Sequence, residues 1–432
     1  MKPFRIYIGG NIYGAGNIGD DAALHGILHI AESSLPEADI TVGIDNSQKP
    51  EGLRAHLHYV HSHDMRQVTS AIKESDLFIC GGGTMLSDEL NLSFPLEYNA
   101  RLISVAKFCG KRVWMLGIGA NRLRHPKAVK MARTIVGLSD LITVRDDQSR
   151  NVCLELGAKP SRTVTTVDPA FLLEPRETPR TRELKKHLRC RGKVFGVNVV
   201  NEAWAHLNEY KAAIARACNH LSSRYGYFPV FFCNEVRGGD FFDFAANSHT
   251  AGLLSCEHEL LEPVYYSPQE MIDILSAFEF VIGMRMHSLI FAAVARTPFV
   301  AVSRVDKVDN LMHLFGLSPS GSVTNCKITK LIWDVQHILE KGPRLKRHLA
   351  ACVAYLRRKC LKNATLLRKL TAARCGFHPK ATPSSLEFVL RTHLSHKKSY
   401  QRLRRLLSRQ MDSTKVARNF LLSSKANLRD LR

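Results

Sequence analysis

The sequence lacks several features that would point to a membrane-spanning or secreted protein. No run reaches the roughly 18 uncharged apolar residues that a membrane span needs, and residues 1–10 read as a strand without the long apolar core of a signal peptide. The 11 cysteines form no CxxC pair and show no ligand-like spacing with histidine. Because disulfide frameworks belong to small secreted domains, we expect reduced thiols in a cytoplasmic protein, peripheral at most on the inner face of a membrane. No acid-rich cluster is evident, so neither a metal nor another cofactor is predicted.

Acidic residues are nearly missing from the last quarter of the chain. Residues 341–432 hold 24 Lys and Arg against Glu387, Asp412 and Asp430, and so carry nearly all of the net charge of +22. Such an excess indicates an anionic partner, and Leu/Arg/Lys runs with helical spacing, as at 400–407, are typical of a basic amphipathic helix on an anionic membrane. A solvated tail, or a protein or nucleic-acid partner, is the alternative. Since few aromatic residues are available to stack on bases, we expect a membrane surface and no nucleic acid.

The rest of the chain alternates short apolar strands with helical stretches, and it does so twice. Near-continuous apolar strands separated by helices predict parallel sheets that are covered on both faces. We therefore expect an α/β fold of two Rossmann-like doubly wound domains, at 1–175 and 190–340, joined by a linker near 174–191 and followed by a basic helical or partly disordered extension at 341–432. Ligands bind beyond the carboxyl ends of strands in such sheets, which places a site in the cleft between the domains. The predicted strands are 4–8, 40–44, 76–80, 112–116 and 141–144, then 194–199, 229–232, 280–282 and 299–302.

Three glycine-rich segments follow strands of the first half. Residues 14–19 match G-x-G-x-x-G, but the strand before them is predicted to end at Gly9-Gly10, several residues too early for a dinucleotide fold. The loop amides and the following helix N-terminus can still face an anion or a sugar hydroxyl. Residues 81–84 and 117–121 let the backbone come close to a ligand, although each segment is equally explained by a turn that permits close packing. The candidate binding residues are Gly16, Asn17, Gly19, Asp20, Gly82, Gly83, Thr84 and Asn121.

The sharpest signal lies at residues 283–288, between a predicted strand and an apolar helix. Arg285 supplies a bidentate fork and the helix amides add partial positive charge, so the segment suits a multiply charged anion. His287 can exchange a proton near neutral pH, although a structural helix cap is the alternative. Arg145 ends another strand and is either a second cation facing the cleft or a partner of the next carboxylates. Asp168 reads as structural, and the loop 304–309 reads as either solvated or facing the ligand.

Together these motifs resemble the polysaccharide pyruvyl transferase family. The resemblance implies a GT-B-like fold, phosphoenolpyruvate as donor, and as acceptor a sugar of a cell-surface polysaccharide or of its lipid-linked precursor. It also implies that Arg285 and His287 belong to the donor site, in the second domain, with Arg145 as a further cation, and that the first domain takes the acceptor. The matching segments, in order over roughly residues 5–315, are 17–20, 81–84, 117–119, 144–146 with Ser149, 168–170 and 283–288.

The chemistry of this donor agrees with the charges in the sequence. Phosphoenolpyruvate carries a carboxylate and a phosphate, so its pocket needs two or three convergent cations. We expect His287 to act as the general acid, Arg285 to hold the donor, and Ser288 to join the binding residues. The alternatives are a glycosyltransferase of the same architecture that uses a sugar nucleotide, a dinucleotide-dependent oxidoreductase resting on residues 14–19, and a non-catalytic basic membrane-binding adaptor.

Overall fold

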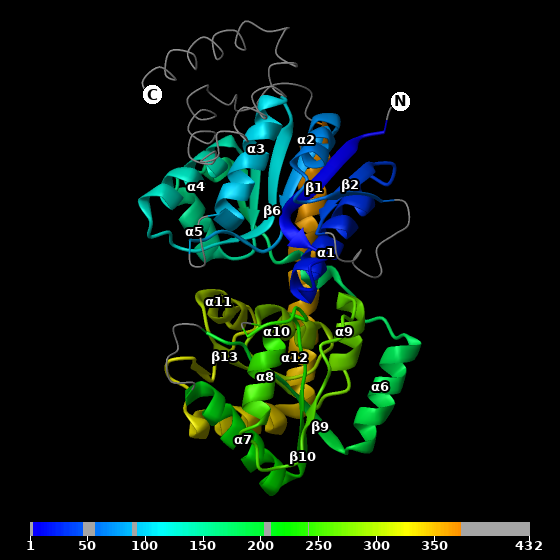
Figure 1. Cartoon of the computed structure of the whole chain (residues 1–432), viewed down its shortest axis with the longest axis vertical. Helices are drawn as coiled ribbons and strands as arrows, with labels where there is room; N and C mark the ends of the chain where they lie inside the picture. The colour runs from blue at the N-terminus through cyan, green and yellow to red at the C-terminus, as the bar shows by residue number, and fades with distance from the viewer. Residues whose placement is uncertain (1–2, 46–56, 89–92, 203–208, 241, 373–432) are drawn as a thin grey trace, which may run out of the picture.

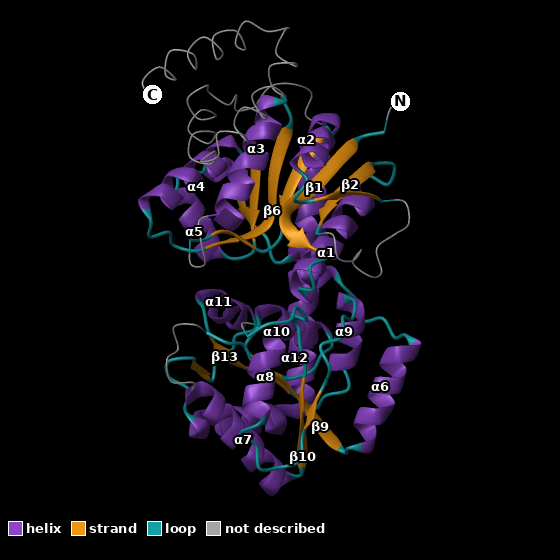
Figure 2. Ribbon diagram, in the orientation of Figure 1, coloured by secondary structure: helices purple, strands orange, loops and turns teal. Residues whose placement is uncertain are grey.

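The structure is a computed structural model that describes residues 3–45, 57–88, 93–202, 209–240 and 242–372. It contains two β-sheets flanked by helices, one in the upper and one in the lower half of Figures 1 and 2. All ladders between the named strands are parallel, and β4 (Leu77–Gly81) and β7 (Leu141–Val144) are buried along their whole length. Such burial explains the near-continuous apolar sequence of the strands, because a parallel sheet is covered on both faces. The predicted α/β fold of two doubly wound sheets is confirmed.

The first sheet is built by residues 5–165. Its order reverses beside β1 (Arg5–Tyr13), which lies between β2 and β4, and a crevice for ligands forms at such a switch point. The glycine-rich loops after β1 and β4 lie at this point. The other strands are β2 (Asp39–Ile44), β3 (His58–His61), β5 (Thr84–Leu86), β6 (Arg112–Ala120) and β8 (Thr163–Thr165). The helices of this half are α1 (Ile18–Ser34), α2 (Met65–Glu74), η1 (Ser93–Glu97), α3 (Tyr98–Phe108), α4 (Pro126–Leu138), α5 (Asp147–Glu155), η2 (Pro160–Arg162) and η3 (Pro169–Leu172).

The second sheet repeats this arrangement with residues 193–322. Its switch point lies between β9 (Lys193–Asn198) and β12 (Val281–Gly283), so the loops after these strands open toward the first half. The other strands are β10 (Tyr227–Phe231), β11 (Glu259–Leu260), β13 (Phe299–Ser303) and β14 (Gly321–Ser322). The helices are α6 (Pro179–Cys190), α7 (Glu209–Tyr225), α8 (Asp243–Ala251), α9 (Pro268–Leu275), α10 (Met286–Val294) and α11 (Asp306–Leu314).

The predicted linker at 174–191 is wrong, because most of it forms α6. The Thr178 side chain accepts the amide of Thr181, and Pro179 occupies the first turn, so the Pro/Thr composition marks a helix start. Lys185 Nζ lies 2.6 Å from a carboxylate oxygen of Asp273 and ties α6 to α9.

The long helix α12 (Ile328–Ala372), orange in Figure 1, runs from the second half into the first. It bends at Gly342, whose φ is +33°, followed by Pro343, because neither residue continues the helical ladder. Arg357 fixes the crossing by donating to the carbonyls of Phe171 and Leu173 at 2.8 and 2.6 Å. Residues 373–432 lie outside the described residues, so the predicted domain boundaries stay a prediction.

One hydrophobic core joins the two halves. It extends from β1 and α1 through η3, α10 and α12 to the second sheet, while a separate core fills the far side of the first sheet beneath α3 and α4. The ten described cysteines are free thiols, which agrees with the predicted reduced state. Within the described ranges, no helix combines the length and the apolarity that crossing a bilayer requires.

Candidate functional site

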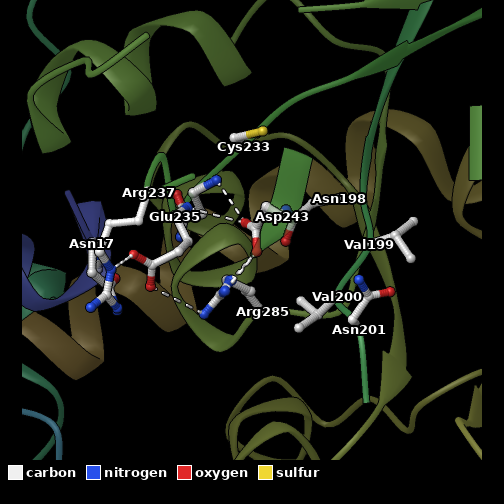
Figure 3. Close-up of polar contacts among 12 residues, drawn as sticks. Asn17, Asn198, Val199, Val200, Asn201, Cys233, Glu235, Arg237, Asp243 and Arg285 are labelled. Atoms are coloured by element: carbon white, nitrogen blue, oxygen red, sulfur yellow. Dashed lines mark hydrogen bonds and ion pairs between the residues drawn. The ribbon is translucent and has the colours of Figure 1, made fainter. Parts of the chain in front are cut away.

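The two halves meet through a short antiparallel bridge between the loops after β1 and β10. The Ile18 amide donates to the Asn234 carbonyl at 3.0 Å, and the Val236 amide donates to the Gly16 carbonyl at 2.9 Å. Asn17 and Glu235 are therefore opposed across the bridge (Figure 3). The two loops therefore lie side by side at the boundary between the halves.

The strand before the G-x-G-x-x-G loop is longer than predicted. β1 passes through Gly9 and Gly10 and ends at Tyr13, because Gly10 adopts a φ of +90° and the pairing register shifts between Ile8 and Tyr13. The predicted end at Gly9-Gly10 is wrong, and the loop follows the strand directly.

The amides of this loop are nevertheless occupied by acceptors of the protein itself. Gly14 N donates to Asp21 Oδ1 at 2.7 Å, and the amides of Gly19 and Asp20 donate to Asn17 Oδ1 at 3.0 and 3.3 Å. Asn17 is thus the N-cap of α1. A phosphate bound here would have to displace these contacts, so the loop gives a dinucleotide-binding function no support.

The glycines after β4 and β6 permit close packing of side chains around the cleft. A Cβ on Gly83 would lie 2.9 Å from Asn11 Nδ2 and 3.6 Å from Asp20 Oδ1. The same addition at Gly82 would come within 2.7 Å of the Ala23 Cβ. The Asn121 amide donates to the carbonyl of Leu86, which closes the loop after β6.

Arg145 follows β7 and packs against the segments that contain these glycines. Its guanidinium packs on Gly119, where a Cβ would collide with it, and donates to Thr84 Oγ1 at 3.0 Å. Carboxylate oxygens of Asp146 and Asp168 lie 3.6 and 4.0 Å away. The buried Nε has no hydrogen-bond partner among the described residues, so the ion pairs with these carboxylates and the bond to Thr84 hold the guanidinium in place.

Arg285 is anchored by a carboxylate that sequence reasoning missed. The fully buried Asp243 accepts hydrogen bonds from Asn198 Nδ2 at 3.0 Å and from the amides of Asn234 and Glu235 at 2.9 and 3.1 Å. Its other oxygen accepts Arg285 Nε at 2.6 Å (Figure 3). Burial alone would lower the pKa of Arg285, but the carboxylates of Asp243 and Glu235 raise this pKa above its usual value. Arg285 therefore stays a fixed cation at the floor of the cleft.

Glu235 connects Arg285 with Arg237 at the cleft rim. Its carboxylate lies 2.5 Å from Arg237 Nε and 3.9 Å from an Arg285 nitrogen (Figure 3). Burial raises the pKa of Glu235, although both guanidinium groups oppose that shift. Arg237 also stacks on the Phe242 ring, 4.7 Å from its centroid. The opposite loop contributes Asp20, whose charge acts on both arginines.

His287, in the first turn of α10, lies against the first half of the molecule. Its Nδ1 approaches Gly19 so closely that a Cβ there would collide with the ring, and its Nε2 lies 3.6 Å from Asp168 Oδ2. The His287 side chain is 13% exposed, so it borders the cleft without filling it. Asp168, predicted to be only structural, caps η3 through Oδ1 and directs Oδ2 toward His287. Burial alone would raise the pKa of Asp168, but His287 and then Arg145 lower it.

Lys307, on α11, adds a further cation. The sequence alone left open whether its segment, 304–309, is solvated or faces the ligand. Lys307 borders a small pocket between the halves, and burial, followed by the charges of Arg304, Arg145 and Arg285, lowers its pKa to about 7. Among the described residues, no carboxylate lies within ion-pair distance of its amino group. The pocket is lined by polar residues Arg145, Asp146, Asp168, Lys307 and Asn310 and by apolar residues Phe171, Met286, Ile290, Leu311 and Leu314.

Ser288 lies behind the cleft. It is fully buried and its hydroxyl donates to Asn198 Oδ1 at 2.8 Å, so it supports the end of β9 instead of reaching a ligand. The structure therefore brings Arg145, Arg285, His287 and Asp20 to one cleft, together with Lys307, Asp168, Glu235 and Arg237.

Comparison with known proteins identifies a matching sequence family. The sequence profile of the family described as Polysaccharide pyruvyl transferase matches residues 17–306. No curated protein matches.

The fold is shared with several solved structures. HepE from Anabaena in complex with UDP and glucose is 12% identical with a TM-score of 0.55, over 85% of this chain and 99% of that one. UDP-GlcNAc 2-epimerase from Neisseria meningitidis bound to UDP-GlcNAc is 11% identical with a TM-score of 0.53, over 85% and 100%. The corresponding epimerase from Methanocaldococcus jannaschii is 11% identical with a TM-score of 0.54, over 90% and 99%. At these identities the likeness concerns the fold, and it confirms the GT-B-like architecture.

Proposed function

Because the chain belongs to the polysaccharide pyruvyl transferase family, we propose that it transfers a pyruvyl group from phosphoenolpyruvate to a sugar and closes a cyclic ketal. The acceptor is a sugar of a cell-surface polysaccharide or of its lipid-linked precursor. The observation that carries the proposal is the convergence of Arg145, Arg285 and Lys307 from both halves on one cleft, beside His287. A donor with a carboxylate and a phosphate needs such an arrangement of cations.

We place the donor at the boundary between the two halves. Arg145 and Lys307 border a small, partly apolar pocket there, one from each half. Arg285 lies on the same side as Lys307, and its charge acts on Lys307. A bound dianion offsets the repulsion among these cations, so Lys307 gains a proton more readily when the donor is present.

The reaction then follows from the positions of the proton donor and the cations. His287 as imidazolium gives a proton to the methylene carbon of the donor, and a C–H bond forms there while positive charge develops at C2. One sugar hydroxyl then forms a bond to C2. A second hydroxyl of the sugar also bonds to C2, while the bond between C2 and the phosphate oxygen breaks and phosphate leaves. The two hydroxyl protons go to the phosphate and back to His287. Arg285 and Lys307 stabilise the departing phosphate.

The acceptor side is formed by the first half. Gly16, Asn17 and Asp20 are partly exposed there, whereas Gly19 is buried against His287, and Asp20 Oδ1 accepts Asn11 Nδ2 at 3.0 Å. A partly exposed carboxylate opposite the cations suits a hydrogen bond from a sugar hydroxyl. Gly82, Gly83, Thr84 and Asn121 act behind this surface, by allowing Asp20 and Arg145 to approach the cleft.

The test measures phosphate release from phosphoenolpyruvate with a panel of acceptor glycans. We expect acceptor-dependent release by the wild type and a loss on the order of 10²–10⁴ in Arg285→Ala. Arg133→Ala, on the exposed face of α4, is the matched loss of an arginine and should retain turnover. The rival is transfer from a sugar nucleotide, because fold does not fix chemistry. Turnover of a sugar nucleotide with no phosphate released from phosphoenolpyruvate would establish the rival.

We further propose that the basic C-terminal region holds the enzyme on an anionic membrane, where a lipid-linked acceptor would be presented. The described part of this region supports the proposal, because residues 341–372 contain no acidic residue and α12 exposes the side chains of Arg344, Lys346 and Arg347. Each basic residue near an anionic surface contributes about 1 kcal/mol. Tyr355, 58% exposed, adds an aromatic ring on this helix.

Truncation within α12 would not test membrane binding cleanly, because Leu349, Val353 and Leu356 are buried in the shared core. The sharper variant reverses charge at Arg344, Lys346 and Arg347 to Glu in the full chain. We expect it to lose flotation with anionic vesicles, while reversal of Lys130 and Arg133 on exposed α4 retains it. Equal flotation of both variants and the wild type would contradict a role for these three basic residues.

A further inference from the structure

Asp168 and His287 form a pair that is built from both halves of the molecule. Asp168 begins η3 in the first half, His287 begins α10 in the second, and Oδ2 and Nε2 lie 3.6 Å apart. Neither atom has a hydrogen-bond partner among the described residues, although both are buried. Asp168 is 3% exposed, so its carboxylate has no solvent to stabilise it and depends on these neighbours.

The surroundings of His287 leave Asp168 as its counter-charge. α1 presents Gly19, which has no side chain, with Asp20 beyond it. α10 itself presents the Phe291 ring, with centroids 6.2 Å apart. Arg145 reaches the same carboxylate at 4.0 Å, and Lys307 borders the pocket that Asp168 lines. Within the described part of the chain, Asp168 is the carboxylate within 4 Å of the imidazole.

We propose that Asp168 is a positioning residue that acts through His287, by holding its ring and stabilising the imidazolium that serves as the acid. This inference rests on the proposed pyruvyl transfer. When the N–H bond of the imidazolium breaks and the C–H bond of the donor forms, His287 becomes neutral and Asp168 stays ionised. Because Arg145 shares the carboxylate, Asp168 also links the acid to a cation that binds the donor.

The first test uses pH profiles of two matched variants. Asp168→Asn and Asp146→Asn each remove a carboxylate near Arg145, and each leaves an oxygen that still caps its helix. We expect Asp168→Asn to lower kcat by roughly 10- to 100-fold. It should also move the basic limb of kcat, measured with saturating phosphoenolpyruvate so that Lys307 is charged, to lower pH, because the acid form of His287 is lost sooner without its counter-charge. The position of that limb should not move in Asp146→Asn. A lower kcat with an unmoved limb in Asp168→Asn would overturn the proposal.

A double-mutant cycle separates action through His287 from an independent role. In a His287→Ala background, Asp168→Asn should change kcat less than about twofold. Multiplicative losses would show that Asp168 acts on its own and would overturn the proposal. Thermal unfolding of each variant shows whether a loss of turnover follows from a loss of fold.

A spectroscopic readout makes this inference testable without turnover. With nitrogen-15-labelled histidine, the His287 signals are assigned by their absence in His287→Ala and titrated in the wild type and in Asp168→Asn. A midpoint displaced to lower pH in Asp168→Asn supports the pair, and superimposable titrations overturn it. If the wild type released no phosphate from phosphoenolpyruvate, the proposed function would fail while this titration still decided whether the two side chains are coupled.

Discussion

Gly19 and His287 touch across the boundary between the two halves, and the imidazole occupies the space where a Cβ of residue 19 would lie. Gly19 lies in the first turn of α1 with ordinary helical backbone, so glycine is needed here for space. We predict that Gly19→Ala displaces the His287 ring and lowers kcat by at least about tenfold, since a positioned acid contributes 10²–10⁴-fold. Kinetics of phosphate release would check this.

Gly137→Ala is the matched control, because Gly137 lies within α4 and an added Cβ meets nothing within 4 Å. Replacing glycine by alanine at an exposed helical position raises the free energy of unfolding by roughly 0.5–1 kcal/mol. This variant should therefore keep its activity and unfold at a slightly higher temperature. Unchanged turnover in Gly19→Ala would mean that the His287 ring has room to move without loss of function.

Asp243 is predicted to set the affinity for the donor through Arg285. The carboxylate of Asp243 accepts hydrogen bonds from four N–H groups, whereas the amide of Asp243→Asn has one acceptor oxygen and no charge. Arg285 therefore loses its anchor, and the buried ion pair is broken. Breaking a buried pair costs about 3–5 kcal/mol of folding free energy. We expect lower stability together with a higher KM for phosphoenolpyruvate, measured by denaturant unfolding and steady-state kinetics.

The pair Lys107–Asp140, at 2.8 Å and buried between α3 and β7, provides the control for this stability loss. Asp140→Asn should destabilise the fold to a similar degree and leave the KM for phosphoenolpyruvate unchanged. If both variants raised the KM equally, the effect of Asp243 would be a general consequence of instability.

Local patterns were sufficient to predict the two parallel sheets. The strands are apolar because both faces are covered, and the glycines after β4 and β6 lie where side chains pack too tightly for a Cβ. The same patterns misplaced the end of β1, because Gly9-Gly10 was interpreted as a strand end, whereas Gly10 lies within the strand, where Cys80 and Asn99 leave no space for a Cβ. They also misread α6, whose composition is that of a capped helix start and of a linker alike.

The site was predictable only in part, because its members lie far apart in the sequence. Arg285 and His287 were found from their place after an apolar strand. Asp243 gave no local signal and Asp168 was interpreted as structural, since each matters through a partner that is 42 or 119 positions away. The importance of Lys307 follows from burial beside three arginines, which only the packing of the two halves creates.

We predict that Lys307 makes the binding of phosphoenolpyruvate pH-dependent. Its pKa, lowered to about 7 by burial and by Arg304, Arg145 and Arg285, means that about half of the free enzyme carries the charge at that pH. Donor affinity should therefore fall as pH rises from 6 to 8, since the neutral amine does not attract the dianion, and calorimetric titration with phosphoenolpyruvate would measure it. Lys307→Arg, always charged, should flatten this dependence, whereas Lys307→Gln should bind weakly at every pH. The same slope in all three proteins would exclude Lys307 as the titrating group.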